Sequence, residues 1–284
     1  MTKVTTGQGQ DSVPARHRAE VDWNRGADGP QASALPPVIP PARALLGNLP
    51  VQAEGLILDL ACGVGSPAFE AARQNPEARV LGVDRADKLI DTARALAAAH
   101  AIGNADFEVM SLDALALPNE SVDAAISQFG FLNEGDLAVS VKELCRVLKG
   151  GAPFSVATWD LLEFNTLFCT VAEVLRRHVP AELLPDFDYL NKLATPGLRE
   201  RVLRQAGIST LHTEMFSWRV PMPSAAAIGA VVSAPVPFGR AWDSLADSEH
   251  ENVKSELEQA TAEFRTADGT YIFPMACRLY WGSR

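Results

Sequence analysis

The stretch LDLACGVGSPAFEAA, residues 58–72, combines residue types that can bind a nucleotide-like ligand. Gly63 and Gly65 interrupt a hydrophobic run, and apolar residues resume at helical spacing after Pro67. Glycines at a strand-to-helix turn let the backbone turn tightly and approach a ligand with no Cβ in the way. The run GVGSPA, residues 63–68, also fits the G-x-G-x-x-A pattern of dinucleotide-binding turns. A turn without a ligand fits the same spacing, so the neighbouring residues must decide.

Three aspartates, Asp59, Asp84 and Asp113, lie at or near the ends of predicted strands around this loop. Asp84 follows Gly65 by 19 residues, where a carboxylate can accept hydrogen bonds from ribose hydroxyls. Asp59 stands inside the first predicted strand, where a charge needs a partner. Loop N–H groups and the ammonium group of a ligand both satisfy that need, and the sequence leaves the two open.

Two cofactor classes are compatible with a loop of this kind. A nicotinamide cofactor carries a pyrophosphate, which is usually held by the amides of a helix N-terminus, and Pro67 removes one such amide. S-adenosylmethionine instead carries adenosine, a sulfonium and an amino acid, so acidic residues suit its positive charge. The three aspartates favour S-adenosylmethionine, and a nicotinamide-dependent oxidoreductase remains the alternative.

The elements that must position these residues alternate between strands and helices, which predicts an α/β fold with a parallel sheet. Helical spacing fills the stretches between the first five strands, beginning for example at Pro67, a favourable first helical residue. Two late strands are separated by a mostly helical block. The predicted strands are residues 56–61, 79–84, 106–112, 123–129, 152–159, 209–221 and 271–282.

This pattern predicts four segments along the chain. Residues 1–50 form a mobile tail and a lid segment, because a polar start is followed by a proline-rich stretch with one tryptophan. Residues 51–221 form a Rossmann-like cofactor-binding core. Residues 222–268 form a helical cap that selects the acceptor, and residues 269–284 form the final strand of the core.

Four stretches, in order, resemble the class I S-adenosylmethionine-dependent methyltransferases, in particular their bacterial UbiE-like small-molecule branch. The resemblance covers about residues 50–160 and implies a Rossmann-like sheet with a reversed final strand. The stretches read LDLACGVGSPAFEAA, VLGVDRADKLIDTAR, FEVMSLDALALPNESVDAAISQFGF and ELCRVLKGGAPFSVATW.

Within this resemblance, the glycine loop matches the acidic loop that cradles the methionine part of the cofactor. One position departs from the broad pattern, since alanine replaces its first glycine, although the D-x-A-C-G-x-G form resembles a common variant. The matching residues are Asp59, Ala61, Gly63 and Gly65.

Three further groups of residues match the rest of the cofactor site. Asp84 takes the place of the acid that binds the ribose, and Arg85 lies beside it near the adenine. Asp113 and Ala114 match the pair that holds the adenine amino group and a ring nitrogen. The resemblance implies that the floor near the methyl group is formed by Ser127, Gln128 and Phe129.

Methyl transfer from a sulfonium depends mainly on positioning and on the exclusion of water, so a general base is optional. None of the five histidines stands in a recognisable catalytic context, and catalytic residues are left unknown. Aromatic residues outside the nucleotide core are the candidates for acceptor contacts, with ordinary core packing as the alternative for each. They are Trp23, Trp159 and Phe131 first, then Phe164, Phe187, Tyr189 and Phe238.

The predicted function is methyl transfer to the oxygen or carbon of a small hydrophobic or aromatic metabolite in secondary metabolism, with S-adenosylhomocysteine as product. One alternative is a cyclase that binds S-adenosylmethionine without transferring its methyl group. A nicotinamide-dependent oxidoreductase is a second alternative, and a ligand-free accessory or interaction protein is a third.

Composition narrows the range of partners. The formal charge of −10 and the absence of a concentrated basic patch predict no nucleic-acid partner. No apolar stretch reaches the length of a membrane span, and no signal peptide is evident, so we expect a cytoplasmic protein that does not enter membranes. The four cysteines lack the paired spacing of a zinc site, which predicts no metal. Monomer and homo-oligomer both remain open.

Overall fold

The structure is a computed structural model, which describes residues 22–28, 35, 39–49, 55–133, 136–234 and 237–284. The predicted tail and most of the predicted lid linker therefore lie outside the described residues. Within the described residues, no helix is both long and apolar enough to cross a membrane.

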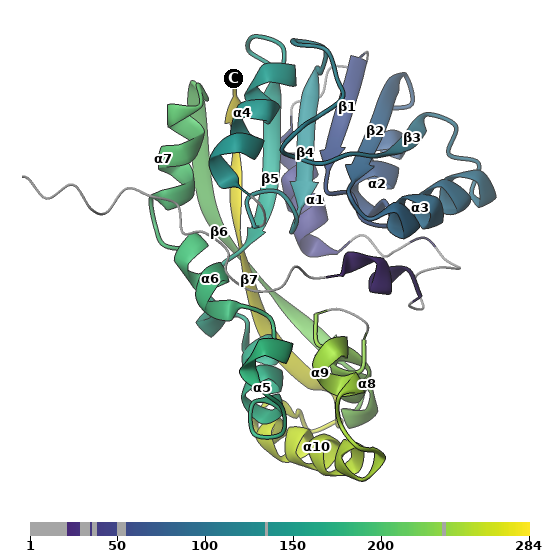
Figure 1. Ribbon diagram of the computed structural model, residues 1–284, viewed down its shortest axis with the longest axis vertical. Coiled ribbons are helices and arrows are strands. Elements are labelled where there is room, and N and C mark those ends of the chain that lie inside the picture. Colours follow the sequence, from purple (N-terminus) through teal and green to yellow (C-terminus); the bar gives the residue numbers. More distant parts are fainter. Residues whose placement is uncertain (1–21, 29–34, 36–38, 50–54, 134–135, 235–236) are drawn as a thin grey trace, which may run out of the picture.

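A seven-stranded sheet forms the centre of the molecule (Figure 1). Its strand order is β3-β2-β1-β4-β5-β7-β6, and β7 runs antiparallel to both β5 and β6, so the predicted reversed final strand is confirmed. This is the Rossmann-like class I methyltransferase sheet that the sequence predicts. The strands are β1 (Gly55–Leu60), β2 (Ala78–Asp84), β3 (Ala105–Val109), β4 (Ala124–Gln128), β5 (Pro153–Trp159), β6 (Thr210–Met222) and β7 (Tyr271–Ser283).

Each face of the sheet is covered by helices, because successive side chains of a buried parallel strand point to opposite faces. In β1, Ile57 belongs to one core cluster and Leu58 to the other. The cluster around Ile57 includes residues of α1 (Pro40–Gly47), α2 (Ser66–Gln74) and α3 (Asp87–Ala99). The cluster around Leu58 includes residues of α4 (Leu137–Val147), α6 (Phe187–Leu193) and α7 (Leu198–Gln205).

A separate group of helices packs on the far halves of β6 and β7, which continue beyond the other strands (Figure 1). The helices from the predicted cap segment are α8 (Ala225–Val232), α9 (Gly239–Asp243), α10 (Asp247–Ala260) and η5 (Ala262–Phe264). They share one hydrophobic cluster with α5 (Thr166–Leu175), a helix from the part of the chain that the sequence assigns to the core. The predicted domain boundaries at 221 and 268 stay a prediction.

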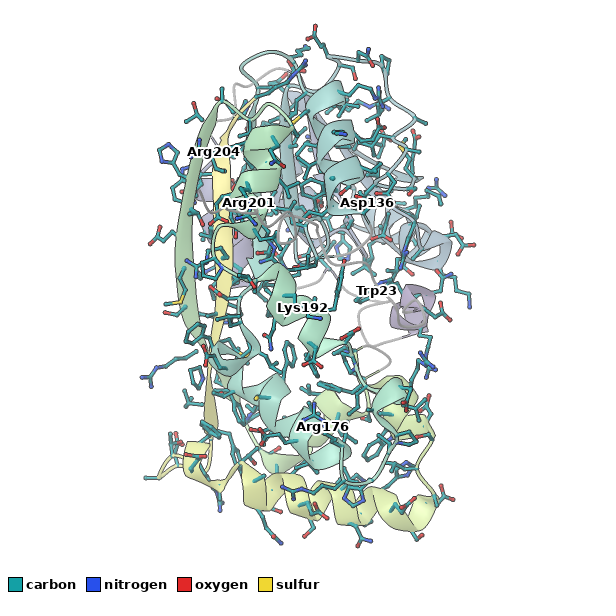
Figure 2. All side chains as sticks on the ribbon, turned by 60° about the vertical axis from the view of Figure 1, so that its left-hand side comes forward. Trp23, Asp136, Arg176, Lys192, Arg201 and Arg204 are labelled. Atoms are coloured by element: carbon teal, nitrogen blue, oxygen red, sulfur yellow. The ribbon has the colours of Figure 1, made fainter. Side chains whose placement is uncertain are left out.

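Short helices connect these parts: η1 (Trp23–Asp28), η3 (Leu162–Phe164) and η4 (Ala181–Leu183). Trp23 on η1 lies on the opposite side of the molecule from the β6 edge, beside the space between the sheet and the cap helices (Figure 2). The basic side chains of Arg201 and Arg204 are exposed on α7, as a solvated helix face requires (Figure 2).

Candidate functional site

A cavity of about 340 Å³ lies at the carboxyl ends of β1, β2 and β4, where open α/β sheets bind ligands. We call it the first cavity. Residues from the glycine loop, from the end of β2 and from the end of β4 form its walls. Its lining consists of Trp23, Ala61, Gly63, Asp84, Arg85, Leu89, Ser111, Leu112, Asp113, Gln128, Phe129, Gly130, Trp159, Phe168 and Pro237.

The glycine loop is held open by backbone conformation and by Asp84. Ala61, Gly63 and Gly65 have φ angles of 54°, 55° and 95°, in the left-handed region. Asp84, 8% exposed, accepts a hydrogen bond from the Gly63 N–H at 3.0 Å and another from the Ala86 N–H at 2.9 Å. One carboxylate therefore ties the loop after β1 to the start of α3 and still lines the cavity.

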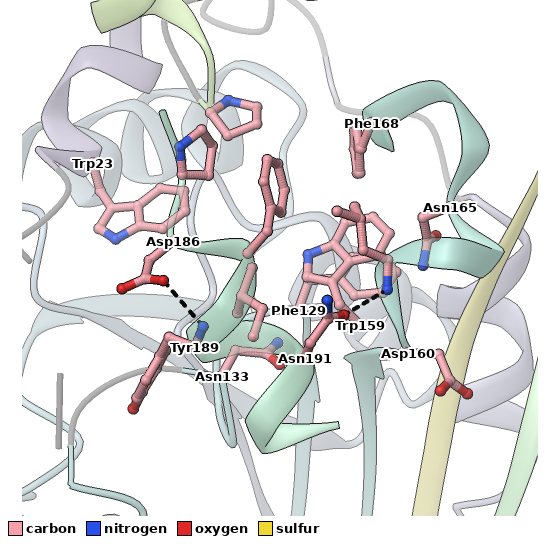
Figure 3. A pocket seen from close by; sticks show the side chains of 15 residues that line it. Trp23, Phe129, Asn133, Trp159, Asp160, Asn165, Phe168, Asp186, Tyr189 and Asn191 are labelled. Carbon is pink, nitrogen blue, oxygen red and sulfur yellow. Dashed lines mark hydrogen bonds between the residues drawn. The ribbon is translucent and has the colours of Figure 1, made fainter. Parts of the chain in front are cut away.

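A second cavity, of about 110 Å³, lies between the sheet and the cap side of the molecule (Figure 3). It shares Trp23, Phe129, Trp159, Phe168 and Pro237 with the first cavity, so the two adjoin. Its other lining residues are Asn133, Asp160, Leu162, Asn165, Pro185, Asp186, Phe187, Tyr189, Leu190 and Asn191.

Stacked aromatic rings, which we call the aromatic wall, line both cavities where they adjoin. The rings of Phe129 and Trp159 are parallel, with centroids 3.9 Å apart and an interplanar angle of 6°. Phe168 meets Trp159 edge to face at 5.1 Å. Phe129 has a φ of 62°, a conformation that costs free energy in a bulky residue and persists only when its surroundings hold it. The wall is thus a fixed flat surface suited to a ring-shaped ligand.

Residues 57–151 match the family model described as a methyltransferase domain. The chain therefore contains a methyltransferase domain.

Curated relatives of this methyltransferase domain act in quinone biosynthesis, according to their names. The chain is 32% identical over 114 residues to the ubiquinone/menaquinone biosynthesis C-methyltransferase UbiE of Geobacter sulfurreducens, covering 39% of this chain and 43% of that protein. It is 38% identical over 97 residues to the demethylmenaquinone methyltransferase of Thermus thermophilus, and the match covers 34% of this chain and 43% of that protein. The chain spans about half the length of the curated relatives it matches.

Solved structures share the fold over most of the chain. The YcgJ protein of Bacillus subtilis superposes with a TM-score of 0.57 at 17% identity and covers 86% of this chain and 97% of its own. A methyltransferase-like protein of Bacillus halodurans gives a TM-score of 0.56 at 16% identity, covering 85% and 97%. At these identities the likeness establishes the fold of the methyltransferase sheet.

Most of the residues that the sequence predicts for the cofactor come together at the first cavity of the methyltransferase domain. Those that line it are Ala61, Gly63, Asp84, Arg85, Asp113, Gln128 and Phe129. Four others are not among its lining residues: Asp59, Gly65 and Ser127 are buried, and Ala114 is exposed. Ser127, for example, donates its hydroxyl to the Leu60 carbonyl at 2.7 Å and accepts the Phe131 N–H at 3.1 Å, which braces β4 against β1. Their contacts with a cofactor stay predictions.

Asp59 is a buried carboxylate inside β1, with 0% exposure and no hydrogen bond to a described residue at either oxygen. Burial raises the pKa of Asp59 well above its ordinary value. The Ala68 N–H opposes this rise, although its geometry falls short of a hydrogen bond, and the negative charge of Asp84 adds to it. Asp59 therefore lowers the stability of the folded protein when it is ionised. A positive charge bound nearby would offset that cost.

We expect Asp59→Asn to stabilise the ligand-free protein more at pH 8 than at pH 5. The folded state holds the Asp59 proton more tightly than the unfolded state, so the stability lost through this group grows as pH rises from the unfolded pKa of about 4 toward the raised folded value. Urea unfolding of both proteins at the two pH values measures this. The exposed Asp91→Asn on α3 is the control. If the free energy of unfolding differs between wild type and Asp59→Asn by the same amount at both pH values, the raised pKa of Asp59 is contradicted.

The aromatic candidates divide between the cavities and the cores. Trp23 and Trp159 line both cavities, and Phe187 and Tyr189 line the second. Phe131 is 1% exposed and packs in the core cluster with α4, away from both cavities. The remaining two are Phe238, buried in the cap cluster, and Phe164, which is 39% exposed.

Sequence reasoning missed several residues of the second cavity. Phe168 lies on α5 and contacts both cavities, but an aromatic residue on an amphipathic helix carries no signal beyond core packing. Asn133, Asn165 and Asn191 come from three separate segments, and amide side chains show no spacing that would mark a site. Of the histidines in the described part of the chain, none lines either cavity.

Proposed function

We propose that this chain transfers the methyl group of S-adenosylmethionine to a flat, apolar ring compound, with S-adenosylhomocysteine as product. The observation that supports this most strongly is the pair of adjoining cavities: acidic residues and a glycine loop line the first, and aromatic rings dominate the second. A donor in the first cavity and an acceptor in the second would meet where the two cavities adjoin, beside Phe129, Trp159 and Phe168. Displacement at a methyl group requires such proximity.

The residues of the first cavity fit S-adenosylmethionine. Asp84 and Asp113 offer carboxylates at its rim, and Leu89 and Leu112 offer apolar surface for a base. The side-chain oxygen Oε1 of Gln128 is buried with no hydrogen-bond partner in the described part of the chain. An unpaired buried acceptor of this kind favours a ligand that donates N–H or O–H groups. A cationic amino-acid ligand beside buried Asp59 fits the same environment.

Bound S-adenosylmethionine supplies an electrophilic methyl group on a sulfonium. Methyl transfer to carbon or oxygen of the acceptor would leave S-adenosylhomocysteine and release one proton of the acceptor to solvent. The residues of this chain would hold the acceptor ring against Phe129 and Trp159 and keep water out. Discharge of the sulfonium in an apolar site lowers the barrier without a dedicated base.

We propose a quinol-type ring as the acceptor and ring carbon as the methylated atom. The curated relatives are named for C-methylation of ubiquinone and menaquinone precursors, and the flat aromatic wall suits such rings. Methylation of oxygen and a role in secondary metabolism stay predictions from the sequence.

The decisive experiment incubates the protein with methyl-labelled S-adenosylmethionine and a panel of acceptors: 1,4-naphthoquinol, 2-naphthol and an aliphatic alcohol of similar size. We expect label in the naphthoquinol product and none in the alcohol. Conversion of a substrate without label would favour the cyclase alternative, whose fold is shared by the [4+2]-cyclase SpnF at a TM-score of 0.50 and 15% identity. Calorimetric binding of NAD in place of S-adenosylmethionine would favour the oxidoreductase.

We expect Trp23→Ala to reduce turnover more than cofactor affinity. Trp23 lines both cavities, and its helix η1 is tied across the opening by an ion pair of Arg25 with Asp243 on α9 and by the Lys88 N–H donating to Asn24 at 3.1 Å. Loss of the indole opens the acceptor side to water.

Steady-state rates and calorimetry with S-adenosylhomocysteine separate the two effects of Trp23→Ala. Trp281→Ala is the matched control, because Trp281 stacks on His212 and lines neither cavity. If Trp23→Ala has the turnover rate and the cofactor affinity of wild type, Trp23 has only a packing role.

A further inference from the structure

Asn133 presents one unpaired amide group at the second cavity. The residue is 3% exposed and lines the cavity (Figure 3). Its Oδ1 accepts a hydrogen bond from Arg199 Nη2 at 2.9 Å. Because an arginine only donates, the atom facing it must be the oxygen, which fixes the orientation of the carboxamide. The Nδ2 group is left buried, with no partner among the described residues.

Arg199 holds this arrangement from behind the cavity wall. It is 1% exposed, the largest of the fully buried side chains. Its Nε donates to the Leu132 carbonyl at 3.1 Å and its Nη1 to the Trp159 carbonyl at 3.2 Å. The guanidinium therefore holds the backbone at Leu132, the backbone at Trp159 and the side chain of Asn133 at the same time.

The charge of Arg199 has no carboxylate within ion-pair distance in the described part of the chain. Burial lowers the pKa of Arg199, while Tyr280, Asp160 and Glu200 oppose this from β7, from the end of β5 and from α7. Asp160 itself is paired with Arg278 at 2.9 Å. A buried cation behind an amide strengthens the amide as a donor, because hydrogen-bonded groups polarise one another in a low dielectric.

We propose that Asn133, held by the positioning residue Arg199, donates its Nδ2 hydrogen to the oxygen of a phenolic acceptor and favours its phenolate form. This inference rests on the proposed function, since it concerns the acceptor of that reaction. An unpaired buried donor costs free energy that a ligand oxygen recovers, and the stacked rings beside it offer a flat apolar surface to such a ligand. A phenolate carries extra electron density on ring carbon as well as oxygen, and both atoms can attack an electrophilic methyl group.

The test follows the ionisation of 4-nitrophenol bound to the full-length protein in the presence of S-adenosylhomocysteine. The phenolate absorbs visible light, so a pH titration at saturating protein measures the pKa of the bound probe. We expect the wild-type protein to lower this pKa by about one unit relative to free probe, the shift produced by one hydrogen bond to the charged form. Asn133→Leu and Arg199→Met should abolish that shift.

Matched variants separate this role from a merely structural one. Asn191→Leu removes another amide of the same cavity, and Arg201→Met removes an exposed charge two residues along α7; both should keep the shift. Asn133→Asp keeps an oxygen for Arg199 but replaces the donor with an acceptor, so it should fold and raise the pKa of bound probe above that of wild type. Unchanged S-adenosylhomocysteine affinity confirms the fold of each variant.

Three results would overturn the inference: no probe binding by wild type, no shift in its pKa, or equal effects of the substitutions at Asn133 and Asn191. A preserved pKa shift with no methyl transfer to any acceptor would defeat the proposed function and leave this donor site standing. Methyl transfer without a pKa shift of the bound probe would defeat this inference and leave the proposed function standing.

Discussion

Replacing Asp84 by alanine is expected to weaken cofactor binding by about 1–3 kcal/mol, between roughly 5-fold and 150-fold in Kd. The carboxylate accepts the N–H groups of Gly63 and Ala86 and lines the first cavity. Its loss leaves two backbone donors unpaired, removes the acceptor proposed for the ribose hydroxyls and loosens the glycine loop. Calorimetry with S-adenosylhomocysteine measures the change.

The control for this prediction is Asp87→Ala, which removes the same charge three residues later. Asp87 is exposed in the first turn of α3 and lines neither cavity. We expect Asp84→Asn to lie between wild type and Asp84→Ala, because a carboxamide keeps one acceptor oxygen for two backbone donors. An unchanged Kd in Asp84→Ala would refute the assignment of this residue to the cofactor.

Gly130→Ala is expected to destabilise the protein by about 1–3 kcal/mol, and Ala61→Gly is expected to restore most of that loss. A Cβ at position 130 would collide with the Cβ of Ala61, so one of the two chain segments must shift. With glycine at 61, the nearest remaining atoms are the backbone oxygen and Cα of residue 61 at 3.3 and 3.5 Å. Ala61→Gly also releases the strain of an alanine at a φ of 54°.

Denaturant unfolding of the two single variants and the double variant gives the coupling free energy between positions 61 and 130. Gly103→Ala serves as control, because a Cβ there meets nothing within 4 Å. Additive single effects would show that the loop and the end of β4 adapt independently. A strong coupling would also explain how this chain tolerates alanine where the related pattern has its first glycine, because the facing position after β4 is itself a glycine.

The first cavity could be predicted in large part from the sequence because its residues follow local rules. Strand and helix periods set where each strand ends, and parallel strands bring those ends to one edge. Gly63, Asp84 and Gln128 are therefore neighbours in any fold with this strand order. Side-chain direction was harder: Asp59 and Ser127 sit one or two residues from lining positions and face the interior instead.

The second cavity was decided by tertiary structure, although the sequence had named Trp23 and Trp159 among the candidates for acceptor contacts. Trp23, Phe129, Trp159 and Phe168 come from four segments that meet only because β6 and β7 extend beyond the sheet and carry α5 to the aromatic wall. Each of these residues looks like ordinary core packing in its own segment, and the amide of Asn133 becomes a site only when Arg199, 66 residues later, takes its oxygen. The sequence by itself determined the sheet and the loop, since these depend on short-range periodicity and backbone freedom, and its resemblance to class I methyltransferases indicated the class of donor. The acceptor side was decided by long-range packing, because no local pattern records which distant side chains will share a cavity.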